Sequence, residues 1–229
     1  MNLTIILRYL FTVFEFQSSI AIAKTPTPPL SGGLYYIFCK ILHFQLIFGT
    51  LDATELPSTN LTLQYVAIGR GTQNYTCASS SSLPVPQGAV ATLFDLNWLA
   101  YHNEPLLNTI PPVAVYLPLQ PYGFGLTFPV AVLGQHFFDS TGTPTFDLYS
   151  VNKALYGSKT GDIKAPAAAN KGPAGTGAVD WLQLTANAGY ESNGLSLAYR
   201  VVTAGGQPFN CTVAGAITVQ YAAEYWFYD

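Results

Sequence analysis

From residue 56 to the end of the chain, apolar and polar residues alternate with a period of two in short runs separated by Gly, Pro, Asn and Ser. This alternation is typical of strands that bury one face. No run shows a convincing long helical period. Many short strands without alternating helices predict an all-β fold, either an antiparallel β-sandwich or a β-barrel. The expected strands are residues 61–68, 72–78, 88–95, 113–117, 126–138 with a break at Pro129, 144–149, 179–186, 195–203 and 216–228.

The run 216–228 alternates most regularly. Its length and aromatic ending predict a strand at the centre of a sheet. One face carries Ile217, Val219, Tyr221, Ala223, Tyr225 and Phe227, and the other carries Thr218, Gln220, Glu224 and Trp226. In contrast, residues 156–178 are rich in Gly, Ala, Pro and Lys without periodicity, which predicts a long surface loop.

The first 55 residues follow a different pattern. Residues 1–23 have an early Arg8, an apolar run and a small-x-small ending, which is typical of a secretory signal peptide. Residues 24–55 are expected to be a Pro/Gly linker followed by a doubtful apolar insert. Within it, residues 34–51 contain Lys40 and His43, which a membrane span would bury at high cost. A membrane anchor and a segment of non-native coding sequence at 31–50 are the alternatives, and residues 56–229 are the expected domain.

Composition narrows the class of protein. Of 229 residues, 49% are hydrophobic, 14% aromatic and only 9% charged, so one domain with a large core is expected. From residue 56 there are six Lys or Arg against nine Asp or Glu, with no basic cluster, so nucleic acid is not an expected partner. Beyond the secretory signal, membrane association is not expected either.

Six blocks in the expected domain carry a resemblance: "GRGTQNYTC", "GAVATLFD", "GQHFFDSTGTPTFDL", "AVDWLQLTA", "YRVVTAGGQPFNC" and "VQYAAEYWFY". They resemble a family of secreted fungal proteins, with bacterial relatives, defined as a domain of unknown function. The resemblance covers roughly residues 56–228. It implies location and fold rather than an activity.

Members of that family are often labelled malate dehydrogenase, and the sequence tests the label. A Rossmann dehydrogenase needs a Gly-rich turn between a strand and a helix to hold the pyrophosphate. "GRGTQNY" and "GPAGTGAVDW" lack the G-x-G-x-x-G spacing and run into strands. The dehydrogenase label is therefore rejected, and no cofactor is expected.

The resemblance also implies a disulfide, since the cysteines of two blocks correspond to Cys77 and Cys211. Relatives often have a further cysteine where this chain has Trp98, so an alternative partner for Cys77 is lost here. Cys39 lies in the doubtful segment. Three cysteines without C-x-x-C give no metal-site pattern. Glycosylation sequons occur at Asn60, Asn74 and Asn210.

Two groups of residues are candidate ligand-binding sites, and each has a plain structural alternative. His136 and Asp139, with Asp147 eight residues later, suit an acid/base pair. However, "DSTGTP" also predicts a turn with Asp139 at its start and a structural histidine nearby.

The second group is Trp181, Arg200, Glu224 and Trp226. Exposed rings with Arg and Glu suit sugar binding, and Arg200 and Glu224 could share a face if their strands are neighbours. A structural ion pair with packed aromatics is the alternative. No nucleophile elbow, H-E-x-x-H or P-loop is present.

The sequence favours a secreted or cell-wall protein without catalytic residues that binds carbohydrate or a small ligand. A hydrolase or lyase that uses His136 with a carboxylate is the alternative.

Overall fold

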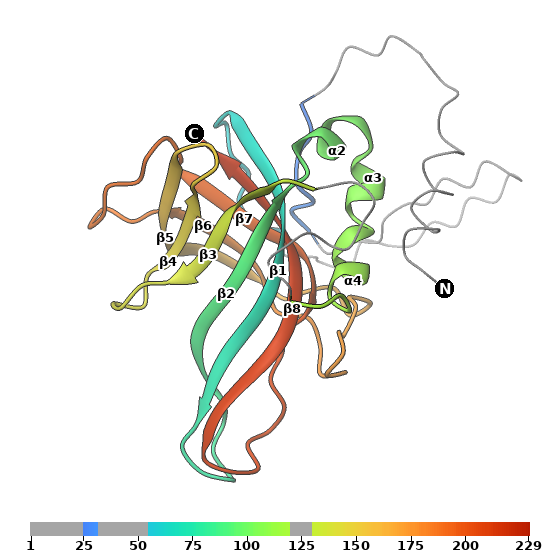
Figure 1. Ribbon diagram of the computed structural model, residues 1–229, viewed down its shortest axis with the longest axis vertical. Coiled ribbons are helices and arrows are strands. Elements are labelled where there is room, and N and C mark those ends of the chain that lie inside the picture. The colour runs from blue at the N-terminus through green and yellow to red at the C-terminus, as the bar shows by residue number, and fades with distance from the viewer. Residues whose placement is uncertain (1–24, 32–54, 120–129) are drawn as a thin grey trace, which may run out of the picture.

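Eight antiparallel strands form a closed barrel in the computed structural model, which describes residues 25–31, 55–119 and 130–229 (Figure 1). Each strand pairs with its neighbours in sequence, and the first pairs with the last to close the barrel. The expectation of an all-β antiparallel fold is confirmed, and of the two architectures expected it is the barrel. The strands are β1 Leu63–Cys77, β2 Val85–Asp95, β3 Val132–Phe138, β4 Pro144–Leu148, β5 Lys153–Ile163, β6 Trp181–Ala186, β7 Leu197–Gly205 and β8 Gly215–Tyr228.

Three short helices follow β2 and cover one side of the barrel: α2 Asn97–His102, α3 Glu104–Leu107 and α4 Ile110–Ala114. Helix α4 packs on β1, β7 and β8, and α2 packs on β1 (Figure 1). The prediction of a strand at 113–117 is wrong, because residues 113 and 114 belong to α4. Pro111 and Pro112 lie in the first turn of that helix, where a missing N–H costs nothing.

Two hydrophobic cores share the wall of the barrel. The interior core contains Leu93, Phe146, Tyr225 and Phe227 among many alanines. The outer core lies between the wall and the helices, and it includes Ile68, Leu107, Trp181, Tyr199 and Trp226. From Tyr221 onward β8 is therefore buried on both faces, which agrees with its expected central place and explains why Glu224 and Trp226, on the more polar face, are buried too.

Strand β1 joins two runs expected as separate strands, 61–68 and 72–78. The glycines between them permit close packing and do not form a turn. A Cβ on Gly71 would lie 1.9 Å from the carbonyl oxygen of Val90, and one on Gly69 would lie 2.3 Å from the ring of Tyr225. Both positions therefore exclude any side chain while the strand continues.

Strand β5 corrects the expected loop 156–178. Residues 156–163, which were expected to begin the loop, belong to β5, and this strand pairs with β4 and β6. The loop itself begins at residue 164. The composition of Gly, Ser, Lys and Thr hid a strand because only alternate residues such as Leu155 contact the core. The expected signal peptide, residues 32–54 with Cys39, and residues 126–129 lie outside the described residues.

The residues on either side of positions 32–54 lie next to each other. Ser31 forms an antiparallel bridge with Glu55, and the amide of Leu56 donates a hydrogen bond to the carbonyl of Leu30 at 2.8 Å. Among the described residues, no helix is long and apolar enough to cross a membrane.

Candidate functional site

His136 lies inside the barrel, on β3. It is 3% exposed, and its ring stacks on Phe146 with centroids 4.2 Å apart. Its Nδ1–H donates to the carbonyl of Thr145 at 2.9 Å, which leaves Nε2 as the unprotonated nitrogen. Burial is the main cause that lowers the pKa of His136 to about 4; the bond to Thr145 opposes the shift, and the positive charge of Arg200 contributes to it. The histidine is therefore neutral above pH 5 and forms part of the aromatic core.

Arg200 points into the same interior from β7. It lies opposite Tyr225 of β8, and its Nε and Nη2 donate to the carbonyl of Asp180 at 3.3 and 2.9 Å. The hydroxyls of Tyr221 and Tyr225 are 2.9 Å apart. Burial raises the pKa of both tyrosines, and the charge of Arg200 opposes that rise. These groups are a polar element of the barrel core.

No carboxylate of the described residues is placed beside His136. Asp147 lies opposite Gln135 in the β3–β4 ladder, so it faces away from His136. Burial, the Thr145 bond and Arg200 account for the shifted pKa of His136, and no acid contributes. The acid/base pair expected from the sequence is not assembled among the described residues.

Asp139 begins the β3–β4 turn. Its Oδ1 accepts from the amides of Thr141 and Thr143, both at 2.9 Å, and its Oδ2 accepts from the Tyr190 hydroxyl at 2.9 Å. The hydroxyl of Thr141 and the amide of Thr143 are the main causes that lower the pKa of Asp139 to about 2. The carboxylate stabilises the turn, as the structural alternative predicted.

Glu224 lies on the opposite face of the sheet from Arg200. Strands β7 and β8 are neighbours as expected, but Arg200 pairs with Tyr225 and Val201 with Glu224. The expectation that Arg200 and Glu224 share a face is therefore wrong, because the register offsets them by one residue.

The Glu224 carboxyl is fully buried beneath the helices. Its Oε2 accepts from Nε1 of Trp226 at 2.9 Å, while Oε1 has no partner among the described residues. Burial raises the pKa of Glu224 to about 8; the Trp226 bond opposes this, and the charge of Glu104 on α3 adds to the rise. Glu224 is thus a protonated acid at neutral pH.

The two tryptophans expected on a sugar-binding surface are buried. Trp181 and Trp226 are 1% and 0% exposed and pack in the outer core. The helices and residues 55–57 cover the sheet face that the sequence left open, so neither ring can meet a ligand.

A group of exposed rings lies instead on helix α2. Trp98 is 61% exposed, Tyr101 is 40% exposed, and His102 is exposed beside them. Spacings of three and four residues place these rings on one face of the helix. Trp98 and His102 stack with centroids 4.3 Å apart, and Nδ1–H of His102 donates to the Trp98 carbonyl at 2.7 Å.

One surface pocket adjoins this face, and a second lies next to the first. The first, of about 380 Å³, is lined by residues 100–105 and by Thr25, Pro26 and Thr27. The second, of about 400 Å³, shares Thr25–Thr27 and continues to Tyr199 and Tyr228. Among the described residues, no group of three or more His, Cys, Asp or Glu is placed to hold a metal ion.

The match to a protein family covers residues 57–229 and bears the description "Protein of unknown function (DUF3455)". The chain belongs to this family. No curated protein and no solved structure matches it. The family thus supports the resemblance seen in the sequence and assigns no activity or ligand.

The DUF3455 domain contains the expected disulfide, between Cys77 and Cys211 across 134 residues. A cysteine at position 98, the alternative partner for Cys77, could not reach it. Strand β2 runs from Val85, near Cys77, to Asp95, near Trp98, and ten strand residues span about 33 Å.

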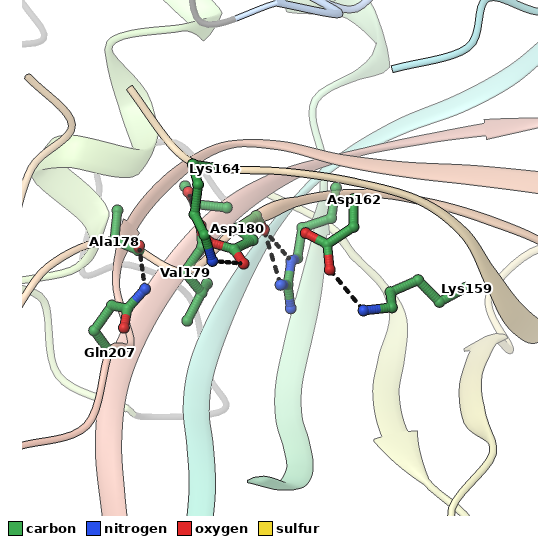
Figure 2. Close-up of polar contacts among 9 residues, drawn as sticks. Lys159, Asp162, Lys164, Ala178, Val179, Asp180 and Gln207 are labelled. Carbon is green, nitrogen blue, oxygen red and sulfur yellow. Dashed lines mark hydrogen bonds and ion pairs between the residues drawn. The ribbon is translucent and has the colours of Figure 1, made fainter. Parts of the chain in front are cut away.

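Surface polar residues of the DUF3455 domain make two ion pairs in the described part of the chain. Figure 2 shows Lys159 with Asp162 at 2.6 Å and Lys164 with Asp180 at 2.7 Å. It also shows Gln207 donating to the carbonyl of Ala178, which ties the β5–β6 loop to the β7–β8 loop. The Lys159–Asp162 pair lies within β5, and the other two contacts stabilise the β5–β6 loop, which contains Lys164, Ala178 and Asp180.

The sequons differ in accessibility. Asn60 and Asn210 are exposed, whereas Asn74 is half-buried in β1 and its Oδ1 accepts from the Thr72 hydroxyl. Glycosylation stays a prediction at all three.

Sequence reasoning missed the surface formed by α2. Trp98 was noted only as a replacement for a cysteine, because a six-residue helix is too short to show a period. The ring spacing at 98, 101 and 102 was the available signal.

Proposed function

We propose that the domain binds carbohydrate through the exposed rings of α2 and the pocket beside them, without catalysis. The observation that carries this is Trp98: it is 61% exposed and is stacked on His102, a residue that lines the pocket. A large ring held out in water gives a flat apolar surface on which the face of a pyranose can stack. The stack with His102 fixes the ring in advance, which lowers the entropy lost on binding.

Polar groups suitable for sugar hydroxyls line the pocket beside this ring. Asn103 and His102 line the pocket from the helical side, and Thr25 and Thr27 line it from the N-terminal segment. Because Nδ1–H of His102 is used by the Trp98 carbonyl, its Nε2 is an acceptor directed away from the helix. A concave site with one aromatic wall and a few polar groups is the usual form of a small-ligand site.

Four features support a secreted or cell-wall location. Residues 1–23 have the composition of a signal peptide. The Cys77–Cys211 disulfide is suited to an oxidising compartment. The exposed Asn60 and Asn210 sequons are accessible to glycosylation, and the sequence resembles secreted fungal proteins.

The test is a glycan array followed by pull-down on wall polysaccharides, with denatured protein as the background. Trp98→Ala should weaken binding about tenfold or more, as expected for a central aromatic contact. Tyr149→Ala is the matched control, because Tyr149 is 53% exposed in the β4–β5 turn, outside both pockets. The proposal fails if the native protein binds no glycan above background, or if the Tyr149 variant loses as much.

A further inference from the structure

Strands β1, β2 and β8 extend beyond the other strands as a three-stranded arm (Figure 1). The β1–β2 loop, residues 78–84, lies at its end, and the β7–β8 loop, residues 206–214, reaches the same end from its start beside the β5–β6 loop. We call these two loops with Val85 the distal tip.

Apolar side chains of the distal tip point into solvent. Leu83 is 81% exposed and Val213 is 71% exposed, the largest fractions among the exposed large hydrophobic side chains of the described residues. Val85 and Phe209 are 54% and 50% exposed. Adjacent exposed apolar side chains of this kind mark an interaction surface more often than an isolated one does.

The arm is also free of charge. No Asp, Glu, Lys or Arg occurs from Gly71 to Phe94 or from Val201 to Ala223, in a chain that contains 21 such residues. A surface with neither charge sign is unsuited to a charged partner or to an anionic lipid headgroup. It is suited to an apolar phase.

The disulfide holds the two loops together. Cys77 lies at the end of β1 opposite Gly215, and its bond to Cys211 fixes the position of Phe209 and Val213 beside the β1–β2 loop. Within that loop, the Ser79 amide donates to the Ser82 hydroxyl at 3.0 Å and the Ser82 amide to the Ser79 carbonyl at 3.3 Å. The apolar side chains are therefore presented by a constrained tip.

We propose that the distal tip inserts into the interface of a neutral lipid bilayer, so that the domain attaches reversibly to a membrane surface. Its size decides against a second copy of the chain, since a stable interface buries about 800 Å² on each partner with 20 to 30 residues a side. The distal tip offers four large exposed apolar side chains. Partition into an interface needs no complementary partner surface, and its strength follows the apolar area buried.

The proposal is independent of carbohydrate binding, because helix α2 follows the opposite end of β2. It concerns contact with one leaflet, not a membrane span.

The test is sedimentation of the full chain with phosphatidylcholine vesicles, after enzymatic removal of N-glycans, because Asn210 lies within the distal tip. Leu83→Asp combined with Val213→Asp should lower the partition coefficient at least tenfold. The matched control is Val113→Asp with Tyr149→Asp, two exposed apolar positions outside the arm at 40% and 53% exposure. Binding should not change between 0.1 and 1 M salt, because no ion pair is involved.

A second readout locates the contact. Leu83→Trp should show a blue-shifted emission on addition of vesicles and quenching by lipids with brominated acyl chains, whereas Tyr149→Trp should show neither. Three results would overturn the proposal: no vesicle binding by the native chain, equal loss in the tip and control variants, or binding that disappears at high salt. Self-association that is lost only in the tip variant, without lipid, would replace the membrane with a second copy and overturn it too.

Discussion

Glu224 and His136 are buried titratable residues that make the stability of the fold depend on pH in opposite directions. His136 has its pKa lowered to about 4 inside the barrel, and Glu224 has its pKa raised to about 8 outside it. Below pH 6.5 the unfolded chain takes up a proton at His136 that the folded chain refuses, so stability falls as pH drops toward 4. Above pH 4.5 the unfolded chain releases a proton from Glu224 that the folded chain keeps, so stability falls as pH rises toward 8.

The first prediction is the effect of Glu224→Gln on this profile. The Glu224 contribution to stability is fully present below pH 4.5 and is lost as pH rises through about 8, on the order of 5 kcal/mol in total. Gln keeps an oxygen that can accept from Trp226 and cannot ionise. The variant should match the native protein near pH 4.5 and exceed its stability at pH 8 to 9.

Urea denaturation at half-unit steps from pH 4.5 to 9 measures the difference. Asp147→Asn is the control, because Asp147 is a strand carboxylate that is only partly buried. A native profile that stays level from pH 6.5 to 9 would show that Glu224 is ionised in the folded state.

The second prediction concerns Gly71, where two backbones nearly touch. Gly71→Ala should destabilise the barrel by about 3 kcal/mol, the upper part of the usual cost of overpacking, because the new Cβ would meet the Val90 carbonyl and the Ala91 Cα at 1.9 and 2.5 Å. Gly189→Ala is the control, since its nearest neighbour would be Asn187 Oδ1 at 3.5 Å. Equal thermal midpoints for the two variants would contradict this account of the glycine.

At the scale of elements, the arm depends on one covalent bond. Strands β1, β2 and β8 pair with one another at its end, but the β7–β8 loop is joined there by Cys77–Cys211. The chain-entropy cost of closing a loop of about 135 residues corresponds to about 4 to 5 kcal/mol.

The third prediction is that replacing both cysteines by serine lowers the free energy of unfolding by about 4 to 5 kcal/mol while far-ultraviolet circular dichroism stays that of a β protein. Equilibrium denaturation with and without reductant measures it, since reductant should lower the native protein to the level of the variant. Cys39→Ser should have no such effect. Insensitivity of the native protein to reductant would mean that the bond is not formed in solution.

The strands and helices also show how much of the secondary structure could be predicted from the sequence. Strand β8 was predicted to within a residue, with both faces assigned, because its alternation is uninterrupted. Strand β5 was missed because its pairing with two neighbours, not its own apolar residues, holds it in place. Helix α4 was mistaken for a strand, since five residues are too few to separate a period of 3.6 from one of two.

At the scale of the molecule, the alternation of apolar and polar residues along a strand does not predict what covers the outer face of a barrel. Glu224 and Trp226 were correctly placed on one face of β8, but that face is covered by helices far from it in sequence. An exposed sugar-binding sheet and a second core have the same strand pattern. For that reason the expected site at Trp181 and Trp226 was wrong, while the strands that contain them were right.

The fourth prediction follows from the bridge between Ser31 and Glu55. Chain ends that lie on adjacent antiparallel positions can be joined by a two-residue turn, so replacing residues 32–54 with Asn-Gly should leave the barrel intact. The flanking contacts would hold the new turn, because Leu30 packs against the outer core and Leu56 is 2% exposed within it. The free energy of unfolding of the shortened chain, measured in urea, should lie within about 1 kcal/mol of that of the full chain.

A control that removes residues 25–57 takes Leu30 and Leu56 from the outer core and should be clearly less stable. Equal losses in the two deletions would show that residues 32–54 contribute to the fold and are no insert.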